Sequence, residues 1–535
     1  MRLAIEYRRQ PRSGSVLLAV LIVLPLLFLA AYQFSQLMMQ EYAAAQSALK
    51  TTQAKALANS GVNMCAVYLS SSTAMSGNLN NNPYSNTGAF QNIPVSDGGG
   101  KVIGRFSIVA PYDQNDPNFS ANSQSSFRYG VIDESSKINI NALYKIDKGA
   151  TLAKVLTNLN TNTVTSQITD SINTWIDGTS RPNGADNTYY NGLTPAYNLK
   201  AAPFDSVDEL LLVEGVTPLV LYGTDWNRNG MQDPGEDSGG GWDPGLAPYL
   251  TVYSRELNTD SQNKPRTWLN TAITSNSFST YLSGLQTSLG DNSVANFVIL
   301  YRVYGSVNGR PSSATNRAVV DADFSSDVAG YLQKNSGSLP PATSISPYDI
   351  IDKTLYFAVR KTGPGAPPPP FQISCTVTSK GNAQLLATLL DKTSNTDPSK
   401  TPEFSGKLNL LTAPQSVLNA FASAGVAGLT PDDVGKITQS RPDVTQSLPT
   451  DAKYQSLAWL ISDVGLSPAV AKGLDAYFTS RTTVYRVQAI GYFDDGGPVA
   501  RIEAVIDATN GSPRIVMWRD LSELGKGYNL SGTNQ

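Results

Sequence analysis

An unbroken apolar run near the N-terminus constrains the fold of this chain more than any other feature. Residues 15–32, SVLLAVLIVLPLLFLAAY, contain no charged side chain. As a helix they would be about 27 Å long, close to the hydrocarbon thickness of a bilayer. The run is preceded by the basic residues Arg2, Arg8, Arg9 and Arg12. The positive-inside rule therefore predicts a cytoplasmic N-terminus, a single membrane crossing and a head outside the cytoplasm.

The apolar run continues into a helical pattern instead of ending at a cleavage site. Its apolar residues recur at helical spacing through Leu57, Val62 and Leu69, with many alanines between them. A secretory signal peptide has a shorter apolar core and ends at an A-x-A-like site. We therefore expect one transmembrane and stalk helix over residues 15–72, with Pro25 as the place of any kink.

Composition excludes several kinds of functional site. The chain has no histidine, which removes the commonest general base and most zinc and iron sites. The cysteines Cys65 and Cys375 form neither a disulfide framework nor a metal quartet, and we expect unpaired, partly buried thiols. The net charge of -3 argues against a nucleic-acid partner.

A basic leader that ends at Gly14, followed by this long apolar helix, resembles a type IV prepilin or a type II secretion pseudopilin. The resemblance implies that a prepilin peptidase cleaves between Gly14 and Ser15 and that the new N-terminus is methylated. Most members carry a glutamate at the fifth mature position, where this chain has Ala19. The leader by itself fits a plain signal anchor equally well.

Motifs in the head narrow this resemblance. Residues 127–143, FRYGVIDESSKININAL, combine a strand, an Asp-Glu pair and a Lys-Ile-Asn-Ile-Asn step. The later motifs are DSINTWIDGTSRPNGADNTYY (170–190), APFDSVDELLLVEGVTPLVLYG (202–223) and SGKLNLLTAPQSVLNAF (405–421). In this order they are similar to general secretion pathway protein K (GspK), the large minor pseudopilin of type II secretion systems. K-type members also lack the fifth-position glutamate, so Ala19 agrees with the resemblance.

The pattern of the head predicts an α+β fold. Residues 101–113 and the segment after 481, TTVYRVQAIGYFDDGGPVARIEAVIDA with PRIVMWRDL, alternate in the manner of antiparallel strands. Between them lie short helices with N-caps and glycine turns, such as Ser206 with Glu209 and the Thr430-Pro431 step. We expect the N-terminal helix to pack on an antiparallel pilin-type sheet, with inserted helical modules of the SAM-like or helix–hairpin–helix-like kind.

The expected segments follow one another along the chain. They are a prepilin leader (1–14), the transmembrane and stalk helix (15–72), early strands of the head (73–143), a first helical module (144–250), an elaborated insertion with a Pro-rich connector (251–400), a second helical module (401–480) and C-terminal strands (481–535).

One loop carries definite chemistry. Residues 225–236, DWNRNGMQDPGE, meet the EF-hand pattern D-x-[DN]-x-[DN]-G-x5-E at every defined position. Calcium takes about six to eight oxygen ligands, which such a loop supplies from alternating residues. The expected ligands are the side chains of Asp225, Asn227 and Asn229, the carbonyl of Met231, Asp233 directly or through water, and bidentate Glu236. The glycine-rich DSGGGWDPG that follows cannot form an exiting helix, which favours a structural site over a switch. The alternative is an ordinary acidic Asn/Gly turn.

The resemblance to protein K implies an assembly function without catalysis. It implies a place at the tip of the pseudopilus with I- and J-type minor pseudopilins, the initiation of fibre assembly and protein export across the outer membrane. The major pseudopilin and the prepilin peptidase would be further partners, with the anchor in the inner membrane and the head in the periplasm. No G-x-S-x-G, Walker or H-E-x-x-H motif supports an enzyme.

Other functions stay open at this point. The chain could be a minor pilin of a related type IV pilus or DNA-uptake system, a membrane-anchored periplasmic calcium-binding protein, or a periplasmic enzyme that uses carboxylates alone. DNA binding by the helix–hairpin–helix-like units is disfavoured, because residues 170–250 hold twelve acids against Arg181, Lys200 and Arg228.

Overall fold

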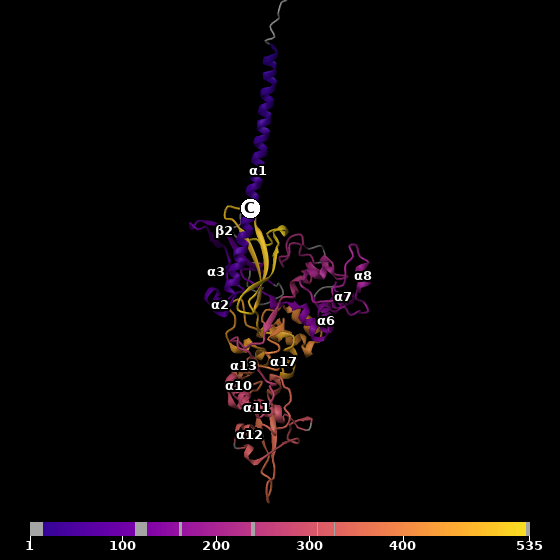
Figure 1. Cartoon of the computed structure of the whole chain (residues 1–535), viewed down its shortest axis with the longest axis vertical. Coiled ribbons are helices and arrows are strands. Elements are labelled where there is room, and N and C mark those ends of the chain that lie inside the picture. Colours follow the sequence, from indigo (N-terminus) through magenta and orange to yellow (C-terminus); the bar gives the residue numbers. More distant parts are fainter. Residues whose placement is uncertain are drawn as a thin grey trace, which may run out of the picture.

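A long helix protrudes from one end of the molecule. The computed structural model describes residues 14–112, 126–159, 163–236, 241–307, 309–325 and 327–530, so the predicted leader up to residue 13 lies outside the described residues. Helix α1 (Gly14–Tyr68) contains Pro25 without interruption and leaves the head as a single rod (Figure 1). Its side chains are exposed almost throughout residues 16–49 and buried at Ala54, Leu57 and Val62. By length and composition, α1 is the one helix in the described part of the chain that could cross a membrane.

The buried half of α1 packs on an antiparallel sheet. Its main strands are β1 (Ile93–Ser96), β2 (Val102–Pro111), β18 (Val484–Tyr492), β19 (Ala500–Asp507) and β20 (Arg514–Asp520), in the order β1-β2-β18-β19-β20. The short strands β3 (Phe127–Arg128) and β4 (Ile132–Asp133) pair with β2 and β18. A Cβ on Gly491 would lie 2.2 Å from the carbonyl oxygen of Ala54, so glycine lets the helix approach the central strand. The predicted α+β fold, with a long N-terminal helix and an antiparallel sheet, is confirmed.

Short helices form two modules that are inserted between the early and late strands. Between α1 and the sheet lie α2 (Ser72–Leu79) and α3 (Thr87–Phe90). The first module contains η1 (Glu134–Ser136), β5 (Ile138–Asn139), α5 (Ile140–Asp147), α6 (Ala150–Asn158), α7 (Ser166–Asp177), α8 (Asn187–Asn191), η2 (Asp208–Leu212), α9 (Pro218–Tyr222), η3 (Ala247–Tyr249) and β6 (Leu250–Thr251). The second contains β16 (Leu408–Asn409), α14 (Gln415–Ser423), η6 (Val426–Gly428), α15 (Pro431–Ser440), η7 (Ala452–Gln455), α16 (Ala458–Ser462), α17 (Pro468–Leu474) and β17 (Phe478–Thr479). The last turn is η8 (Ser522–Leu524).

Local sequence explains where several of these helices begin. The side chains of Thr217, Thr430 and Ser467 accept a hydrogen bond from the backbone N–H three residues later, and each is followed by proline at the first helical position. Only half of the predicted capping box forms, because the N–H of Glu209 donates to the hydroxyl oxygen of Ser206 but the Glu209 carboxylate accepts from the N–H of Asp205. The turn that follows is the 3-10 helix η2 and not a longer α-helix. The modules, the sheet and α1 share one hydrophobic core.

The middle region has a core of its own and lies at the end of the molecule opposite the free end of α1 (Figure 1). Its elements are β7 (Arg255–Leu257), β8 (Thr267–Trp268), α10 (Phe278–Leu289), α11 (Asn292–Tyr304), β9 (Ser306–Val307), β10 (Arg310–Pro311), β11 (Ala318–Val320), η4 (Ala322–Ser325), α12 (Val328–Lys334), η5 (Pro347–Ile350), β12 (Thr354–Val359), β13 (Phe371–Ser374), α13 (Ala383–Lys392), β14 (Thr393–Ser394) and β15 (Glu403–Ser405). The proline-rich segment 364–370 joins β12 to its antiparallel neighbour β13.

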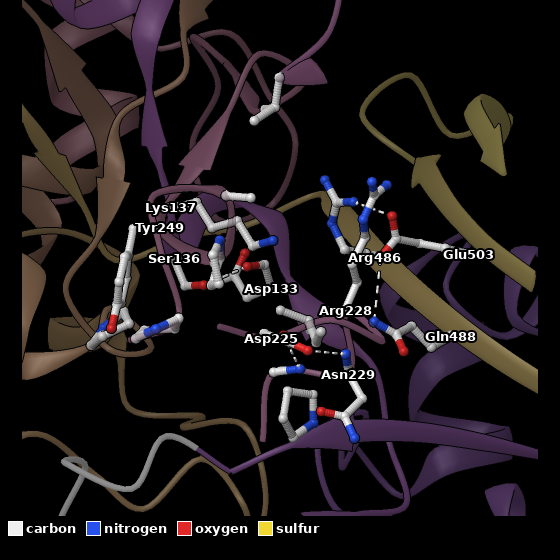
Figure 2. A pocket seen from close by; sticks show the side chains of 18 of the residues that line it. Asp133, Ser136, Lys137, Asp225, Arg228, Asn229, Tyr249, Arg486, Gln488 and Glu503 are labelled. Atoms are coloured by element: carbon white, nitrogen blue, oxygen red, sulfur yellow. Dashed lines mark hydrogen bonds and ion pairs between the residues drawn. The ribbon is translucent and has the colours of Figure 1, made fainter. Parts of the chain in front are cut away.

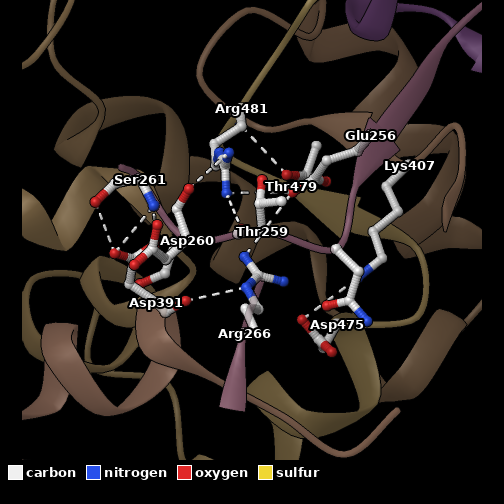
Figure 3. A network of polar contacts seen from close by, with 12 residues as sticks. Glu256, Thr259, Asp260, Ser261, Arg266, Asp391, Lys407, Asp475, Thr479 and Arg481 are labelled. Carbon is white, nitrogen blue, oxygen red and sulfur yellow. Dashed lines mark hydrogen bonds and ion pairs between the residues drawn. The ribbon is translucent and has the colours of Figure 1, made fainter. Parts of the chain in front are cut away.

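A buried charge cluster joins the middle region to the second module (Figure 3). Oε1 of Glu256 lies 3.9 Å from Nη2 of Arg266 and 3.9 Å from Nη1 of Arg481. Arg481 donates a hydrogen bond to the carbonyl of Thr259. Burial alone would raise the pKa of Glu256, but the charges of Arg481 and Arg266 outweigh it and lower that pKa. The carboxylate therefore stabilises the folded state above its unfolded pKa, and this contribution is lost as the pH falls through its folded pKa.

The substitution Glu256→Gln should destabilise this junction. It leaves two buried guanidinium groups without their counter-charge, which should lower the free energy of unfolding by about 3 kcal/mol. Scanning calorimetry of the full-length protein in detergent measures the shift. The control Lys436→Met removes an exposed partner of a 3.8 Å pair and should leave the transition in place. Equal behaviour of the two variants would contradict the role of the cluster.

Candidate metal site

The predicted calcium loop is folded around its own side chains. It begins three residues after α9, and Gly230 takes the left-handed conformation (φ 75°) that the sharp turn requires. The Asp225 carboxylate accepts hydrogen bonds from the N–H groups of Asn229 (3.1 Å) and Gly230 (2.8 Å). Glu236 accepts from the N–H groups of Trp226 (3.1 Å) and Asp233 (2.9 Å). The two ends of the loop are thereby closed on each other.

The other expected ligands point inward too. The Asp233 carboxylate accepts from the side-chain amides of Asn227 (2.6 Å) and Asn229 (2.7 Å). The oxygens of these amides accept from the backbone of Asn229 and Met231. Five of the six sequence-predicted residues therefore bring side-chain oxygens into one turn. The sixth, Met231, buries its side chain against the sheet, and its backbone carbonyl oxygen is the expected metal ligand.

The electrostatics of the loop favour a bound cation. Asp225 and Glu236 are each 5 % exposed. Burial raises the pKa of Asp225 to about 6, and the charge of Glu236 adds to this against the opposing backbone N–H groups. Within the described ranges, no Lys or Arg forms an ion pair with Asp225, Asp233 or Glu236. The donor set consists of carboxylate and amide oxygens, which is the set that calcium prefers.

Carboxylates alone would not complete such a site. Among the described residues, no group of three or more His, Cys, Asp or Glu lies close enough to hold a metal. The amide oxygens of Asn227 and Asn229 and the carbonyl of Met231 would have to contribute, as the EF-hand pattern requires.

The loop is attached to the sheet and to the C-terminal segment. Arg501 of β19 is fully buried and donates to the backbone carbonyl of Asn227. The hydroxyl of Tyr528 lies 2.8 Å from the carbonyl oxygen of Asn229 and 2.9 Å from Oε1 of Gln488. The side-chain amide of Asn229 also donates to the carbonyl of Gly527. A rigid loop therefore also holds the last described residues against the sheet. No sequence pattern indicates this contact between the loop and the C-terminal segment.

The Asp-Glu pair of the head motif is buried where the sheet meets the second module. Asp133 is 2 % exposed and accepts from the backbone of Ser135 (2.7 Å), the amide of Asn409 (2.8 Å) and the hydroxyl of Thr412. Glu134 is fully buried and bound by Arg486 of β18. The motifs at 127–143 and 405–421 thus meet in space. They were identified separately in the sequence, where nothing shows that they are in contact.

Other acidic and aromatic residues of the first module have structural partners. Asp177 pairs with Arg181 (2.9 Å), and Asp186 caps α8. Trp175 packs edge-on against Tyr190 at 5.3 Å between ring centroids. Elsewhere, Cys65 and Cys375 are free and buried, as the sequence predicts.

Comparison with known proteins finds a family similar to part of the head. Residues 136–222 match the family model described as type II secretion system (T2SS), protein K. No curated protein matches the chain. Among solved structures, it is similar to a chain of the crystal structure of the GspK–GspI–GspJ complex from the enterotoxigenic Escherichia coli type 2 secretion system, with 10 % identity and a TM-score of 0.34 over 90 % of this chain and 97 % of that chain. The family match confirms the resemblance that the head motifs indicate.

Asp133 should give the protein a specific pH dependence. Burial raises its pKa from 3.8 to about 6, although its hydrogen bonds oppose the change. The folded state then holds a proton that the unfolded chain releases near pH 4, so the contribution of Asp133 to the free energy of unfolding falls as the pH rises from about 4 to about 6. A shift of about two pKa units corresponds to roughly 3 kcal/mol.

The variant Asp133→Asn should lack this slope. Calorimetric stability measured between pH 4 and 7 on the wild type and on the variant isolates the contribution of this one group. An unchanged difference between the two proteins across that range would refute the assignment.

Proposed function

We propose that this type II secretion minor pseudopilin of the K type occupies the tip of the pseudopilus and helps to initiate fibre assembly for export across the outer membrane. The match of residues 136–222 to protein K carries the assignment to the secretion system and favours it over a related pilus or a DNA-uptake system. Such a pseudopilin is a structural component and not an enzyme.

The arrangement of the head supports a place at the tip. Helix α1 leaves the head at one end, and the middle region extends the head at the opposite end along the same axis (Figure 1). In a fibre built on packed N-terminal helices, a further subunit stacked beyond this one would meet the middle region. A subunit with this extension is suited to the end of a fibre.

The exposed half of α1 supplies the assembly surface. Its apolar side chains, exposed from residue 16 onward, fit the hydrocarbon of the inner membrane before assembly and the helices of neighbouring subunits afterwards. We propose a cytoplasmic N-terminus, a periplasmic head, cleavage between Gly14 and Ser15 by the prepilin peptidase and methylation of Ser15. Ala19 stands where most pilins carry a glutamate in the membrane segment. A subunit at the tip has no neighbour above it whose position such a glutamate could fix.

We propose the I- and J-type minor pseudopilins as direct partners and the major pseudopilin as the next subunit below. The similar solved structure is itself a complex of three such proteins. Co-expression of the tagged full-length chain with the I- and J-type proteins of the same system, followed by detergent extraction and affinity purification, should recover a heterocomplex.

The matched control for this complex is the major pseudopilin expressed alone with the tagged chain, for which we expect weaker recovery. If neither minor pseudopilin co-purifies, the proposed tip complex is wrong.

We also propose that residues 225–236 bind one calcium ion in a structural role. Asp225, Asn227, Asn229, Asp233 and Glu236 would supply side-chain oxygens, and Met231 its carbonyl. A cation there would offset two buried carboxylates and hold the C-terminal segment on the sheet through Asn229. Residues 241–246 after the loop are not helical. This agrees with a structural metal site that holds the loop in place and not with a regulatory helix pair.

Calcium should raise the melting temperature of the full-length protein in detergent. At 100 times the dissociation constant, binding to the folded state alone adds about 2.7 kcal/mol. The double variant Asp225→Ala with Glu236→Ala should abolish the response, whereas Asp170→Asn on the same module should retain it. A wild-type protein that responds to neither calcium nor a chelator would exclude the site.

A further inference from the structure

A cavity of about 220 Å³ lies where the sheet, the first module and the start of the second module meet (Figure 2). Residues Ser136 and Lys137 line it from the head motif, and Gln488 and Glu503 line it from β18 and β19. Arg228 belongs to the candidate calcium loop and forms part of another wall. The proposed tip function does not use this space, and the proposed calcium loop borders it through Asp225 and Asn229.

The acidic residues around the cavity are already satisfied within its walls. Asp133 and Asp225 hold the hydrogen bonds described above. Asp208 accepts from the hydroxyl of Tyr222 (2.6 Å) and from Arg519. Glu503 accepts from Arg486 (2.8 Å) and Gln488 (3.3 Å). The acids of the lining therefore need no further donor.

Several donors around the same cavity lack such partners in the part of the chain that the structure describes. Lys137 is 8 % exposed, yet its ammonium makes no hydrogen bond and lies 3.9 Å from its nearest carboxylate, Glu134. The indole N–H of Trp242 and the hydroxyl of Tyr84 are buried and unpartnered. Unsatisfied buried donors are costly, and an ammonium is costlier than a neutral group.

Arg228 adds a second cation. Its guanidinium lies 3.7 Å from the centroid of the Tyr222 ring, which holds the group in place by stacking. Over the described residues it forms no ion pair. Among the described residues, two cations and two neutral donors of the lining therefore make no hydrogen bond to an acidic side chain. Such a set of groups is suited to bind an anion.

Besides the polar residues Ser136, Thr412 and Gln488 and the arginines Arg128, Arg486 and Arg519, the remaining walls are mostly apolar or aromatic. They include Pro111, Pro244, Pro248 and Tyr249. The volume is below the roughly 300 Å³ at which drug-sized sites begin, so it accommodates a small group. We propose that this cavity binds a carboxylate carried on an apolar or aromatic group, with Lys137 and Arg228 as its charge partners and Trp242 and Tyr84 as neutral donors.

The ligand has two possible sources with the same chemistry. It is either a free small organic acid or the carboxyl terminus of a peptide chain that ends in an apolar residue. Burial lowers the pKa of Lys137 to about 8, so the group still carries most of its charge at neutral pH, where a bound carboxylate would stabilise it. The site does not require bound calcium, because the side chains of the loop already hold its backbone.

Calorimetric titration of the full-length protein in detergent, with calcium held constant, tests the proposal. The probes are phenylacetate for a free acid and N-acetylphenylalanine for a chain terminus, each beside its uncharged amide, with inorganic phosphate as a further anion. At least one acid should bind, and its amide should bind at least tenfold more weakly. Binding of phenylacetate alone would identify a free acid, and binding of N-acetylphenylalanine alone would identify a chain terminus.

Variants locate the binding. Lys137→Met and Arg228→Met should each weaken the acid at least tenfold, and Trp242→Phe should weaken it several-fold. Lys436→Met, at an exposed lysine outside the cavity lining, should have no effect. Because Lys137 is buried and its substitution can prevent folding, Arg228→Met on the partly exposed loop provides the independent test. No binding of either acid at millimolar concentration, equal binding of acid and amide, tighter binding of phosphate, or acid binding unchanged in Arg228→Met would each overturn the proposal.

Discussion

The head depends on one buried ion cluster at its centre. Arg486 on β18 binds Glu134 at 2.6 Å and Glu503 at 2.8 Å, and all three residues are nearly inaccessible to solvent. Burial alone would raise the pKa of Glu134, but Arg486 and Lys137 outweigh it and lower that pKa. Such a cluster is expensive to desolvate, and removal of one member leaves the others uncompensated. It fixes the point at which the chain leaves the sheet to form the first module.

Much of the local structure could be predicted because its causes are local. The apolar run specifies α1, the Thr-Pro and Ser-Pro steps specify the starts of α9, α15 and α17, and the alternating segment around the DDGG turn specifies two paired strands. The EF-hand spacing is likewise a local pattern, and Gly230 occupies the backbone conformation it requires.

Long-range contacts could not be predicted in this way. Nothing in the periodicity of β2 reveals that its partner is β18, and the hydrogen bond between Asp133 and Asn409 crosses 276 residues. The unpartnered donors around the cavity belong to segments that are unremarkable when read singly. Their common property, the lack of an acceptor, exists only after folding. The middle region had no recognisable motif, and its separate core became visible only in three dimensions.

The order β1-β2-β18-β19-β20 also has a consequence for biosynthesis. The central strand against which α1 and β2 pack is among the last parts of the chain to be made. In a chain synthesised from its N-terminus, β1 and β2 can pair with each other but lack β18 while the inserted modules emerge. The middle region, with its own core, can condense during that interval. The sheet on α1 is completed last, so a chain truncated before β18 would keep α1 but lack the central strand on which that helix packs.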